Sequence, residues 1–555
     1  MIQIVGGLPP DMPPLDPRGA NEGGQAWTDD FERIRPEFYN AADRRIEHLV
    51  QQGLVPCIVG AWKHYLPVMG PEKMKRHWRN LIARYGAYPV MWIVGGEVNR
   101  TAANPKFMGG RAPAMDTTDA AFERGWSDVA RFIHATDPFE RIVGAHNQQN
   151  PFVLDDPTLL DFYFLQTGHS ALCSISAQAD WFDRVSHAQH RGPLILSEAN
   201  YQWLFHDGSY DDQIQRHQFW ATALLGGAGH TYGANGIWQV NQPEQPFGAS
   251  PHGFVWGNTP WPDAMNHAAS EQLGWSKAYL SELPWPKLVP ASDQVRFVLP
   301  DLPPVDETGA QWIEMPDDRG GDRVIGTTFD IPADSTIRRA VLRLASEASY
   351  SLAINGQMVH RNAKLEYADH LKHQTAWSFP LAGEYLQPGR NTLMLDYRKE
   401  AIAADHSLLA DLAIEFSDGR MMHVVSDDRW RWQRPDAGWP GYKLQLDPSQ
   451  FASTASVASD TDDRNVPSEF LPIATYGPMG ASIPGQLWLV YAPAAVPVEL
   501  IGLQADAEFI LERFNPRTNK RMPEETIRSD SFGRWRWDPP RQSGDWVLQV
   551  REVKR

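Results

Sequence analysis

The sequence has few cysteines, no long apolar segment and no cluster of basic residues. Its 555 residues include two cysteines, Cys57 and Cys173, which excludes a framework of several disulfides. No stretch approaches the roughly 18 apolar residues that a membrane-spanning helix requires. Asp and Glu number 68 against 51 Lys and Arg, so the formal net charge is −17. Nucleic-acid binding needs Lys and Arg to neutralise phosphates, so we expect neither a nucleic-acid nor a membrane partner.

Several motifs for other chemistries are also missing. The sequence has no HExxH zinc motif and no Gly-x-Ser-x-Gly nucleophile motif. Gly227 and Gly229 are followed by Tyr232, where a dinucleotide fingerprint requires glycine. We therefore expect no metal and no organic cofactor. The first residues, MIQIVGGLPPD, lack the basic and apolar regions of a secretory leader. This start predicts a cytoplasmic location by default, and a periplasmic or secreted one if upstream residues are missing.

The first half of the chain alternates short apolar runs with longer helical patterns. The apolar runs are Ile2–Val5, Leu54–Gly60, Val90–Val94, Arg141–Ala145, Phe162–Gln166, Leu194–Leu196 and Gly229–Tyr232. Apolar strands joined by helices predict a parallel sheet with both faces covered. Seven strands indicate a (β/α)8 barrel over residues 1–290 that lacks its first βα unit. An open doubly wound sheet is the alternative. An incomplete barrel leaves an exposed strand edge, so we also consider a homo-oligomer.

Beyond residue 290 the pattern changes to the two-residue period of β-strands. Residues 291–465 contain alternating runs and turn signals such as Asn355-Gly356 and Pro388-Gly389, which predict a β-sandwich. Ser453–Asp463 is polar and predicts a linker. Residues 466–555 contain a second set of strand patterns, which predicts a small C-terminal β-domain.

Two glutamates follow apolar runs of the predicted barrel. Glu97 comes after Val90–Val94, and Glu198 comes after Leu194–Leu196. Reactive side chains of such barrels lie at the carboxyl ends of the strands, so these carboxylates are expected at one mouth. Glycoside cleavage needs two carboxylates, one that protonates the departing oxygen and one that stays ionised. We assign Glu97 as general acid/base and Glu198 as nucleophile. The alternative is that either glutamate makes a structural ion pair or caps a helix.

Other strand ends supply aromatic and polar groups suited to a sugar. Aromatic faces pack against the C–H groups of a sugar ring, and planar polar side chains bind its hydroxyls. The candidate substrate-binding residues are Trp62, His64, Asn99, His146, Asn147, Gln166, His169, Tyr201, Tyr232 and Trp238.

Several stretches of the first half, taken together, resemble a known family. They are Tyr85-x-x-x-Pro89-Val-Met-Trp92-Ile-Val-Gly-Gly-Glu97, Leu165-Gln-Thr-Gly168-His169-Ser170, Pro193-Leu-Ile-Leu-Ser-Glu198, Gly229-His-Thr-Tyr232-Gly-Ala-Asn-Gly236-Ile-Trp238-Gln239 and Leu283-Pro-Trp285-Pro-Lys-Leu288-x-Pro290. This set resembles the apiosidase-like glycoside hydrolases. The resemblance implies a (β/α)8 barrel with the acid/base after strand four and the nucleophile after strand seven, which correspond to Glu97 and Glu198. The family often has Asp where this chain has Glu97, and its barrel begins one βα unit earlier.

The remaining regions resemble domains that accompany glycosidase barrels. Ile354-Asn355-Gly356-Gln357 and Val425-Ser426-Asp427-Asp428-x-Trp430 are similar to galactose-binding-like β-sandwiches. Phe514-Asn515-Pro516-Arg517-Thr518 and Asp545-Trp546-Val547-Leu548 resemble a small C-terminal β-domain often fused to this barrel and named for collagen binding. Collagen binding does not follow from that name.

These observations predict a retaining glycoside hydrolase that removes a terminal or branching sugar from plant or microbial polysaccharide. The first alternative is a non-catalytic carbohydrate-binding protein on a degenerate or truncated barrel. A lyase ranks last, because it needs a cationic group beside its base and basic residues are sparse near the predicted pocket.

Overall fold

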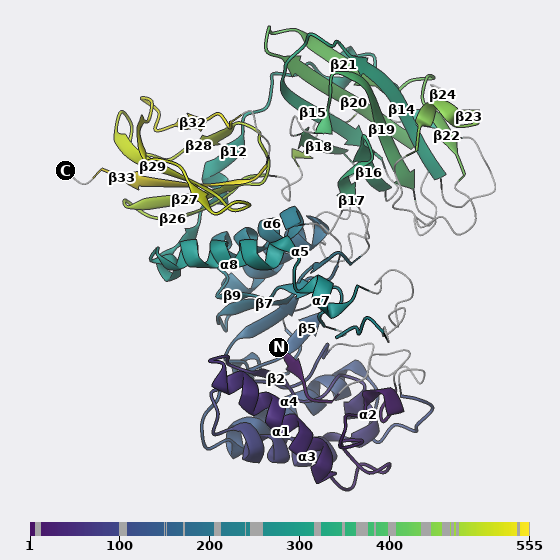
Figure 1. The fold of residues 1–555 in the computed structure, drawn as a ribbon, viewed down its shortest axis with the longest axis vertical. Coiled ribbons are helices and arrows are strands. Elements are labelled where there is room, and N and C mark those ends of the chain that lie inside the picture. The colour runs from purple at the N-terminus through teal and green to yellow at the C-terminus, as the bar shows by residue number, and fades with distance from the viewer. Residues whose placement is uncertain are drawn as a thin grey trace.

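Figure 1 shows the computed structural model of the chain, with an α/β domain below two β-rich regions. The structure describes residues 1–5, 13–98, 108–148, 150, 152–169, 172–204, 212–238, 240–244, 259–315, 323–346, 350–361, 376–381, 385–397, 407–434, 446–457, 467, 471–472, 477–540 and 544–553.

The α/β domain is built on two short parallel sheets. One sheet has the order β1 (Ile2–Gln3), β2 (Cys57–Val59), β3 (Met91–Ile93) and β4 (Val143–Gly144). The other has the order β5 (His146–Gln148), β6 (Tyr163–Gln166), β7 (Leu194–Glu198) and β9 (Gly229–His230). Only Ala145 separates β4 from β5. The end of β3 bonds to both, since Val94 N donates to Gly144 O at 2.9 Å and His146 N donates to Gly95 O at 3.2 Å. The strands therefore follow one another in a single parallel series.

Helices alternate with these strands and cover them. They are α1 (Pro36–Gln51), α2 (Tyr65–Met69), α3 (Pro71–Tyr85), α4 (Asp119–Thr136), α5 (Leu172–Ser186), α6 (Asp212–Leu224), α7 (Trp261–Ala264) and α8 (Ala268–Ser281). Proline occupies the first helical position of α1 and α3, where its missing N–H has no cost. On α3, Met74, Trp78, Leu81 and Tyr85 recur at three- and four-residue spacing and are buried. None of the helices described is long and apolar enough to cross a membrane.

The α/β class of the first half is confirmed, whereas the predicted (β/α)8 barrel is not. Among the described residues, no strand pairing joins β9 to β1, so the series is not closed by hydrogen bonds there. The barrel and the domain boundaries at 290 and 465 stay predictions.

The middle region is a sandwich of two mainly antiparallel sheets. One sheet contains β13 (Ile313–Glu314), β15 (Ile337–Ala345), β18 (Ala376–Leu381), β20 (Ser407–Phe416), β21 (Met421–Val425), β24 (Ser456–Val457) and β25 (Leu471–Pro472). The other contains β14 (Arg323–Ile331), β16 (Tyr350–Ile354), β17 (Gln357–Arg361), β19 (Gly389–Tyr397), β22 (Arg431–Gln433) and β23 (Ser453–Thr454). Alternate residues of the central strands, such as Leu342 and Leu344 of β15 and Leu393 and Leu395 of β19, are buried between the sheets.

The stretch expected to be a polar linker is partly sheet. Ser453 pairs with Trp432, and Val457 pairs with Ile313. Ala455, between them, is buried and its N–H donates to Trp430 O at 2.8 Å. The linker prediction is therefore wrong for residues 453–457, because their partners lie far away in the sequence and local composition does not reveal them.

The C-terminal region is a second, smaller β-sandwich, so the all-β character of the chain beyond the α/β domain is confirmed. Its larger sheet contains β11 (Val289–Pro290), β26 (Met479–Ile483), β27 (Leu487–Ala492), β29 (Glu508–Asn515), β30 (Lys520–Arg521), β31 (Glu525–Arg528) and β33 (Trp546–Glu552). The smaller sheet contains β12 (Val295–Phe297), β28 (Val498–Leu500) and β32 (Trp535–Trp537). Thus the chain leaves the α/β domain, adds β11 and β12 to this sandwich, and then enters the middle one.

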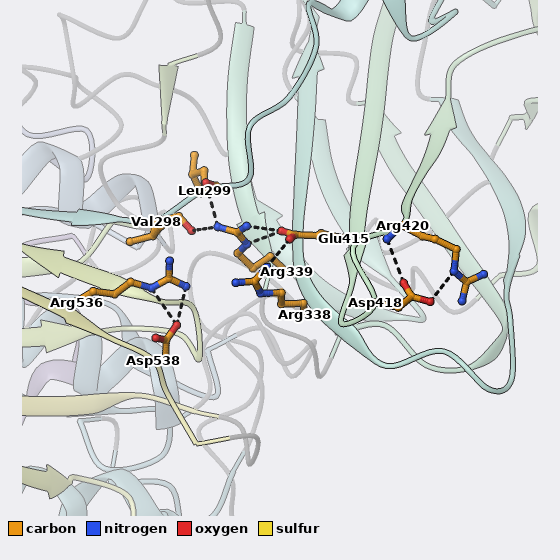
Figure 2. Close-up of polar contacts among 9 residues, drawn as sticks. All are labelled: Val298, Leu299, Arg338, Arg339, Glu415, Asp418, Arg420, Arg536 and Asp538. Carbon is orange, nitrogen blue, oxygen red and sulfur yellow. Dashed lines mark hydrogen bonds and ion pairs between the residues drawn. The ribbon is translucent and has the colours of Figure 1, made fainter.

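The segment that joins the two sandwiches is held by arginines of β15. Val298 N donates to Pro497 O of the C-terminal sandwich at 2.8 Å. Figure 2 shows that Arg339 reaches back to the same segment, with Nη1 3.5 Å from Val298 O and 3.2 Å from Leu299 O. Glu415 on the adjacent strand β20 accepts hydrogen bonds from Arg338 at 2.8 Å and Arg339 at 2.6 Å. The middle sandwich is thereby anchored at its junction with the C-terminal one.

Candidate active site

The predicted site residues come from the carboxyl ends of neighbouring parallel strands. The ends of β2 and β3 stay paired beyond the strands: Trp62 bridges Gly96, and Lys63 N donates to Gly96 O at 2.9 Å. β7 and β9 likewise continue into a short parallel pair, β8 (Tyr201–Gln202) with β10 (Gly233–Ala234). The side chains that follow these strands are therefore carried on hydrogen-bonded backbone.

Glu198 is the last residue of β7, and its carboxylate is surrounded by donors. Its side chain is 8% exposed. Gln166 Nε2 donates to Oε1 at 3.0 Å, and His169 Nε2 lies 3.0 Å from the same oxygen. His146 Nε2 is 3.4 Å from Oε2, and Tyr201 also hydrogen-bonds to the carboxylate. A buried carboxylate is stable only with such partners.

An acceptor oxygen lies against each ring nitrogen of His169. Its Nδ1 lies 2.8 Å from Ala199 O, which can only accept a hydrogen bond. Its Nε2 faces Glu198, which also only accepts while it is ionised. Both ring nitrogens therefore face acceptor oxygens, which fix the orientation of the imidazole ring beside the carboxylate.

Burial raises the pKa of Glu198, but the surrounding groups more than offset it. The hydrogen bond and positive charge of His169, the charge of His146 and the hydrogen bond with Tyr201 all lower it, and the resulting pKa lies below the ordinary 4.5. Glu198 is thus ionised at neutral pH, which is the state a nucleophile requires.

Glu97 lies directly after the bridged end of β3. Its backbone is left-handed, with φ of 50°, which is uncommon for a residue other than glycine. Its Oε2 accepts a hydrogen bond from Lys63 Nζ at 2.7 Å. The Glu97 side chain is 19% exposed and that of Lys63 is 6% exposed, so the carboxylate can be reached from solvent while the ammonium is buried.

The charges of both carboxylates shift the pKa values of two further side chains, His146 and Tyr201. Burial lowers the pKa of His146, while Glu198 and Glu97 oppose that shift. Burial raises the pKa of Tyr201 well above 10, and the charges of Glu198 and Glu97 add to it. The charges of both glutamates therefore act on the same two buried side chains.

The structure places the other predicted residues in different roles. Trp62 is buried, with its ring 5.5 Å from that of His146, and so does not present an open face. His64 is also buried, which lowers its pKa to about 3, and its ring lies 4.7 Å from that of Tyr65. Asn147 is buried beside His146 on β5. The side chains of these residues are buried in the α/β domain.

The remaining predicted residues follow β9 or lie outside the described part. Tyr232 is half-buried and donates a hydrogen bond from its hydroxyl to Gln202 Oε1. Trp238 is partly exposed in the turn after β10. Asn99 lies outside the described residues, as does Gln239 of the resembling motif.

Lys63 was not among the residues predicted from the sequence, and it is a basic residue in contact with the proposed acid. Lys63 stands between Trp62 and His64, both of which were selected because they follow an apolar run. A lysine at the end of a buried strand needs a counter-charge, and this requirement was the available signal. In the described part of the chain, no group of three or more His, Cys, Asp or Glu is arranged to hold a metal ion.

Comparisons with known proteins give one family match and several structural ones. A family model described as "Apiosidase-like, catalytic domain" matches residues 15–287. A solved structure described as "Glycoside hydrolase" is 14% identical, with a TM-score of 0.52, and the match covers 99% of this chain and 84% of that one. A glycoside hydrolase family 5 structure from Bacteroides vulgatus ATCC 8482 is 13% identical, with a TM-score of 0.50, and the match covers 99% and 81%. At these identities the two structures show a shared fold. A search of curated proteins found no match.

Proposed function

Because residues 15–287 belong to the apiosidase-like catalytic domain family, we propose that this chain is a glycoside hydrolase that retains the anomeric configuration. The proposed substrate is a carbohydrate, from which the enzyme removes a terminal or branching sugar of plant or microbial polysaccharide. The proposed catalytic pair is Glu97, as acid/base, and Glu198, as nucleophile.

The reaction proceeds in two displacements. In the first, a Glu198 carboxylate oxygen bonds to the anomeric carbon while the glycosidic C–O bond breaks and Glu97 gives its proton to the departing oxygen. In the second, Glu97 takes a proton from water as the water oxygen bonds to the anomeric carbon, and the ester bond to Glu198 breaks. Sugar and free enzyme result, and no cofactor takes part.

The observation that carries the proposal is the donor set around Glu198. Gln166 and His169 both contact Oε1, and Tyr201 hydrogen-bonds to the same carboxylate. His146 lies farther away at 3.4 Å. A buried carboxylate held ionised and oriented by fixed donors is what nucleophilic attack on an anomeric carbon demands.

We also propose the finer architecture. The parallel series from β1 to β9 corresponds to a (β/α)8 barrel short of its first βα unit, with residues 1–290 as catalytic domain, 291–465 as a galactose-binding-like sandwich and 466–555 as an accessory domain. The pairing of β12 with β28 favours placing residues 295–297 with the C-terminal sandwich.

The test uses Glu198→Gln, which keeps the shape of the side chain and removes its charge. Wild type and variant are assayed with a panel of nitrophenyl furanosides and pyranosides. We expect wild type to hydrolyse at least one of them and the variant to lose at least about a hundredfold in kcat/KM. Proton NMR of the first-formed sugar gives the retained anomer if the double displacement operates.

Glu282→Gln is the matched control, since Glu282 is exposed on the same domain and pairs with Arg521 at the surface. It is expected to behave as wild type. If Glu198→Gln is as active as wild type, Glu198 is not the nucleophile. If neither protein cleaves any glycoside while both bind glycans, the chain is a carbohydrate-binding protein and the proposed activity is wrong.

A further inference from the structure

Lys63 follows β2 and makes two hydrogen bonds to the segment that follows β3 and carries the proposed acid, Glu97. Its backbone N–H donates to Gly96 O at 2.9 Å, one residue before Glu97. Its Nζ donates to Glu97 Oε2 at 2.7 Å. Main chain and side chain of one residue therefore hold both the loop that carries Glu97 and the carboxylate itself.

This ion pair differs from the surface pairs elsewhere on the domain. Lys73, for example, pairs with Glu32 at 2.7 Å, but its side chain is 28% exposed and that of Glu32 is 48% exposed. The Lys63 side chain is only 6% exposed. Burying an ammonium costs free energy unless a nearby charge compensates it, and replacing both Lys63 and Glu97 with apolar residues would remove this cost. The buried ammonium of Lys63 costs desolvation free energy, and its place beside the proposed catalytic carboxylate indicates a role in the reaction.

The surroundings of Glu97 leave Lys63 as its closest positive partner among the described contacts. Glu198 at the end of β7 adds negative charge to the site, and Tyr201 on β8 is held neutral by burial. Burial also lowers the pKa of His146 on β5, and the two carboxylates oppose that shift. The charge on the Glu97 carboxylate is thus balanced mainly by the ammonium of Lys63.

We propose that Lys63 is a positioning residue that compensates the negative charge which appears on Glu97 when this carboxyl group protonates the departing glycosidic oxygen. This inference rests on the proposed function of Glu97. The proton moves from the Oε1 side of Glu97 to the glycosidic oxygen as the C–O bond breaks, and the charge left on the carboxylate is stabilised at Oε2 by the Lys63 hydrogen bond. In the second displacement, Glu97 recovers a proton from water and the charge is removed.

Leaving groups separate this role from a purely structural one. A dinitrophenyl glycoside departs without protonation, whereas a phenyl glycoside of the same sugar needs the acid. We expect Lys63→Met to lower kcat/KM for the phenyl glycoside by about a hundredfold, and for the dinitrophenyl glycoside by less than about threefold, because general acid catalysis contributes roughly 10²–10⁴-fold. The sugar is the one that wild type hydrolyses in the nitrophenyl panel.

Companion variants make the result specific. Lys63→Gln, which keeps a donor without charge, is expected to show the same split, and Lys63→Arg, which keeps the charge, to restore most of the phenyl glycoside activity. Lys73→Met removes a paired lysine from α3 and is expected to behave as wild type. In a Glu97→Gln background, Lys63→Met should add little further loss, because both changes act on one step.

The possible outcomes separate the two proposals. Equal losses on both glycosides, or full additivity with Glu97→Gln, would show that Lys63 acts only on the fold. If Glu97→Gln itself shows no dependence on the leaving group, Glu97 is not the acid and the proposed function is at fault. If Lys63→Met does not fold, as judged by circular dichroism, the comparison of Lys63→Gln with Lys63→Arg decides the question.

Discussion

At the scale of single residues, the charge of Glu198 depends on competition between burial and its donors. Burial favours the protonated carboxyl group, and His169, His146 and Tyr201 favour the carboxylate. Since a nucleophile must be ionised, these donors determine the lowest pH at which the proposed reaction runs.

His169→Phe tests this competition. The phenyl ring keeps the contact that His169 makes with Tyr201, whose ring centroid is 4.4 Å away, but it has no donor for Glu198. Burial then prevails and the pKa of Glu198 rises. We expect the acid limb of the kcat/KM profile to move to higher pH by about one unit. The measurement is a pH–rate profile with the nitrophenyl glycoside that wild type cleaves.

His187→Phe is the control for this shift. His187 also faces a carboxylate, with Nδ1 3.3 Å from Asp183 Oδ1, but both side chains are exposed. The acid limb of the kcat/KM profile of His187→Phe should match that of wild type. An unchanged acid limb in His169→Phe would mean that ionisation of Glu198 does not depend on its contact with His169.

Residues that follow apolar runs were predictable one by one, but their contacts were not. Glu97, Glu198, Gln166 and His169 were selected because the carboxyl ends of parallel strands meet at one edge, and the last three do lie in hydrogen-bond contact. The inward packing of Trp62 could not be predicted, because strand ends do not reveal which side a ring takes. The salt bridge of Lys63 was not predicted either, although a lysine at the end of a buried strand needs a counter-charge.

At the scale of elements, the pairing of Trp62, after β2, with Gly96, after β3, determines the position of Glu97. The Trp62 indole lies over Gly96, so that a Cβ on this glycine would be 2.0 Å from Trp62 Cε3. Trp62 is 5% exposed and has little room to move. Glycine at position 96 therefore permits the close approach of the two strand ends.

Gly96→Ala is expected to lower the free energy of unfolding by about 1–3 kcal/mol, since overpacking forces the indole or the strand to shift. Activity should fall as well, because Glu97 follows directly. The measurement is urea unfolding together with kcat/KM. Gly274→Ala is the control: it lies on α8 with no atom within 4 Å of the added Cβ, and it should stabilise the protein by roughly 0.5–1 kcal/mol. Equal stability of the two variants would contradict the proposed crowding at Gly96.

Most helices and strands that are determined by their own residues were predicted from the local sequence pattern. Apolar runs marked the parallel strands, and prolines marked the first turns of α1 and α3. Strands whose stability comes from distant partners were not predicted. β12 (Val295–Phe297) pairs with β28 (Val498–Leu500) of a later region, and β23 (Ser453–Thr454) consists of two polar residues and pairs with β22. Strands of two or three residues are too short to show a period in the sequence.

At the scale of the whole molecule, the α/β domain and the C-terminal sandwich share a buried interface. Figure 1 shows the C-terminal strands lying against α6 and α8. Arg216 of α6 makes two hydrogen bonds to Asp545, at 2.7 and 2.8 Å, although 329 positions separate them. Tyr491 donates to the same carboxylate at 3.0 Å, and Tyr279 stacks on Phe514 with centroids 4.4 Å apart. The residues around Arg216 do not indicate that its partner is Asp545. The contact between the α/β domain and the C-terminal sandwich therefore could not be predicted from sequence pattern or composition.

Asp545→Leu tests whether the two domains unfold as one unit. It leaves the Arg216 guanidinium buried without its counter-charge, and breaking a buried pair in this way costs about 3–5 kcal/mol. We expect urea unfolding, followed by tryptophan fluorescence, to change from one transition to two as the interface weakens.

The double variant Arg216→Met with Asp545→Leu removes both charges and should lose less stability than Asp545→Leu alone, because no uncompensated charge remains. Glu282→Gln breaks an exposed contact with Arg521 across the same interface and should leave the single transition in place. One unchanged transition in Asp545→Leu would mean that apolar packing, rather than the ion pair, joins the domains.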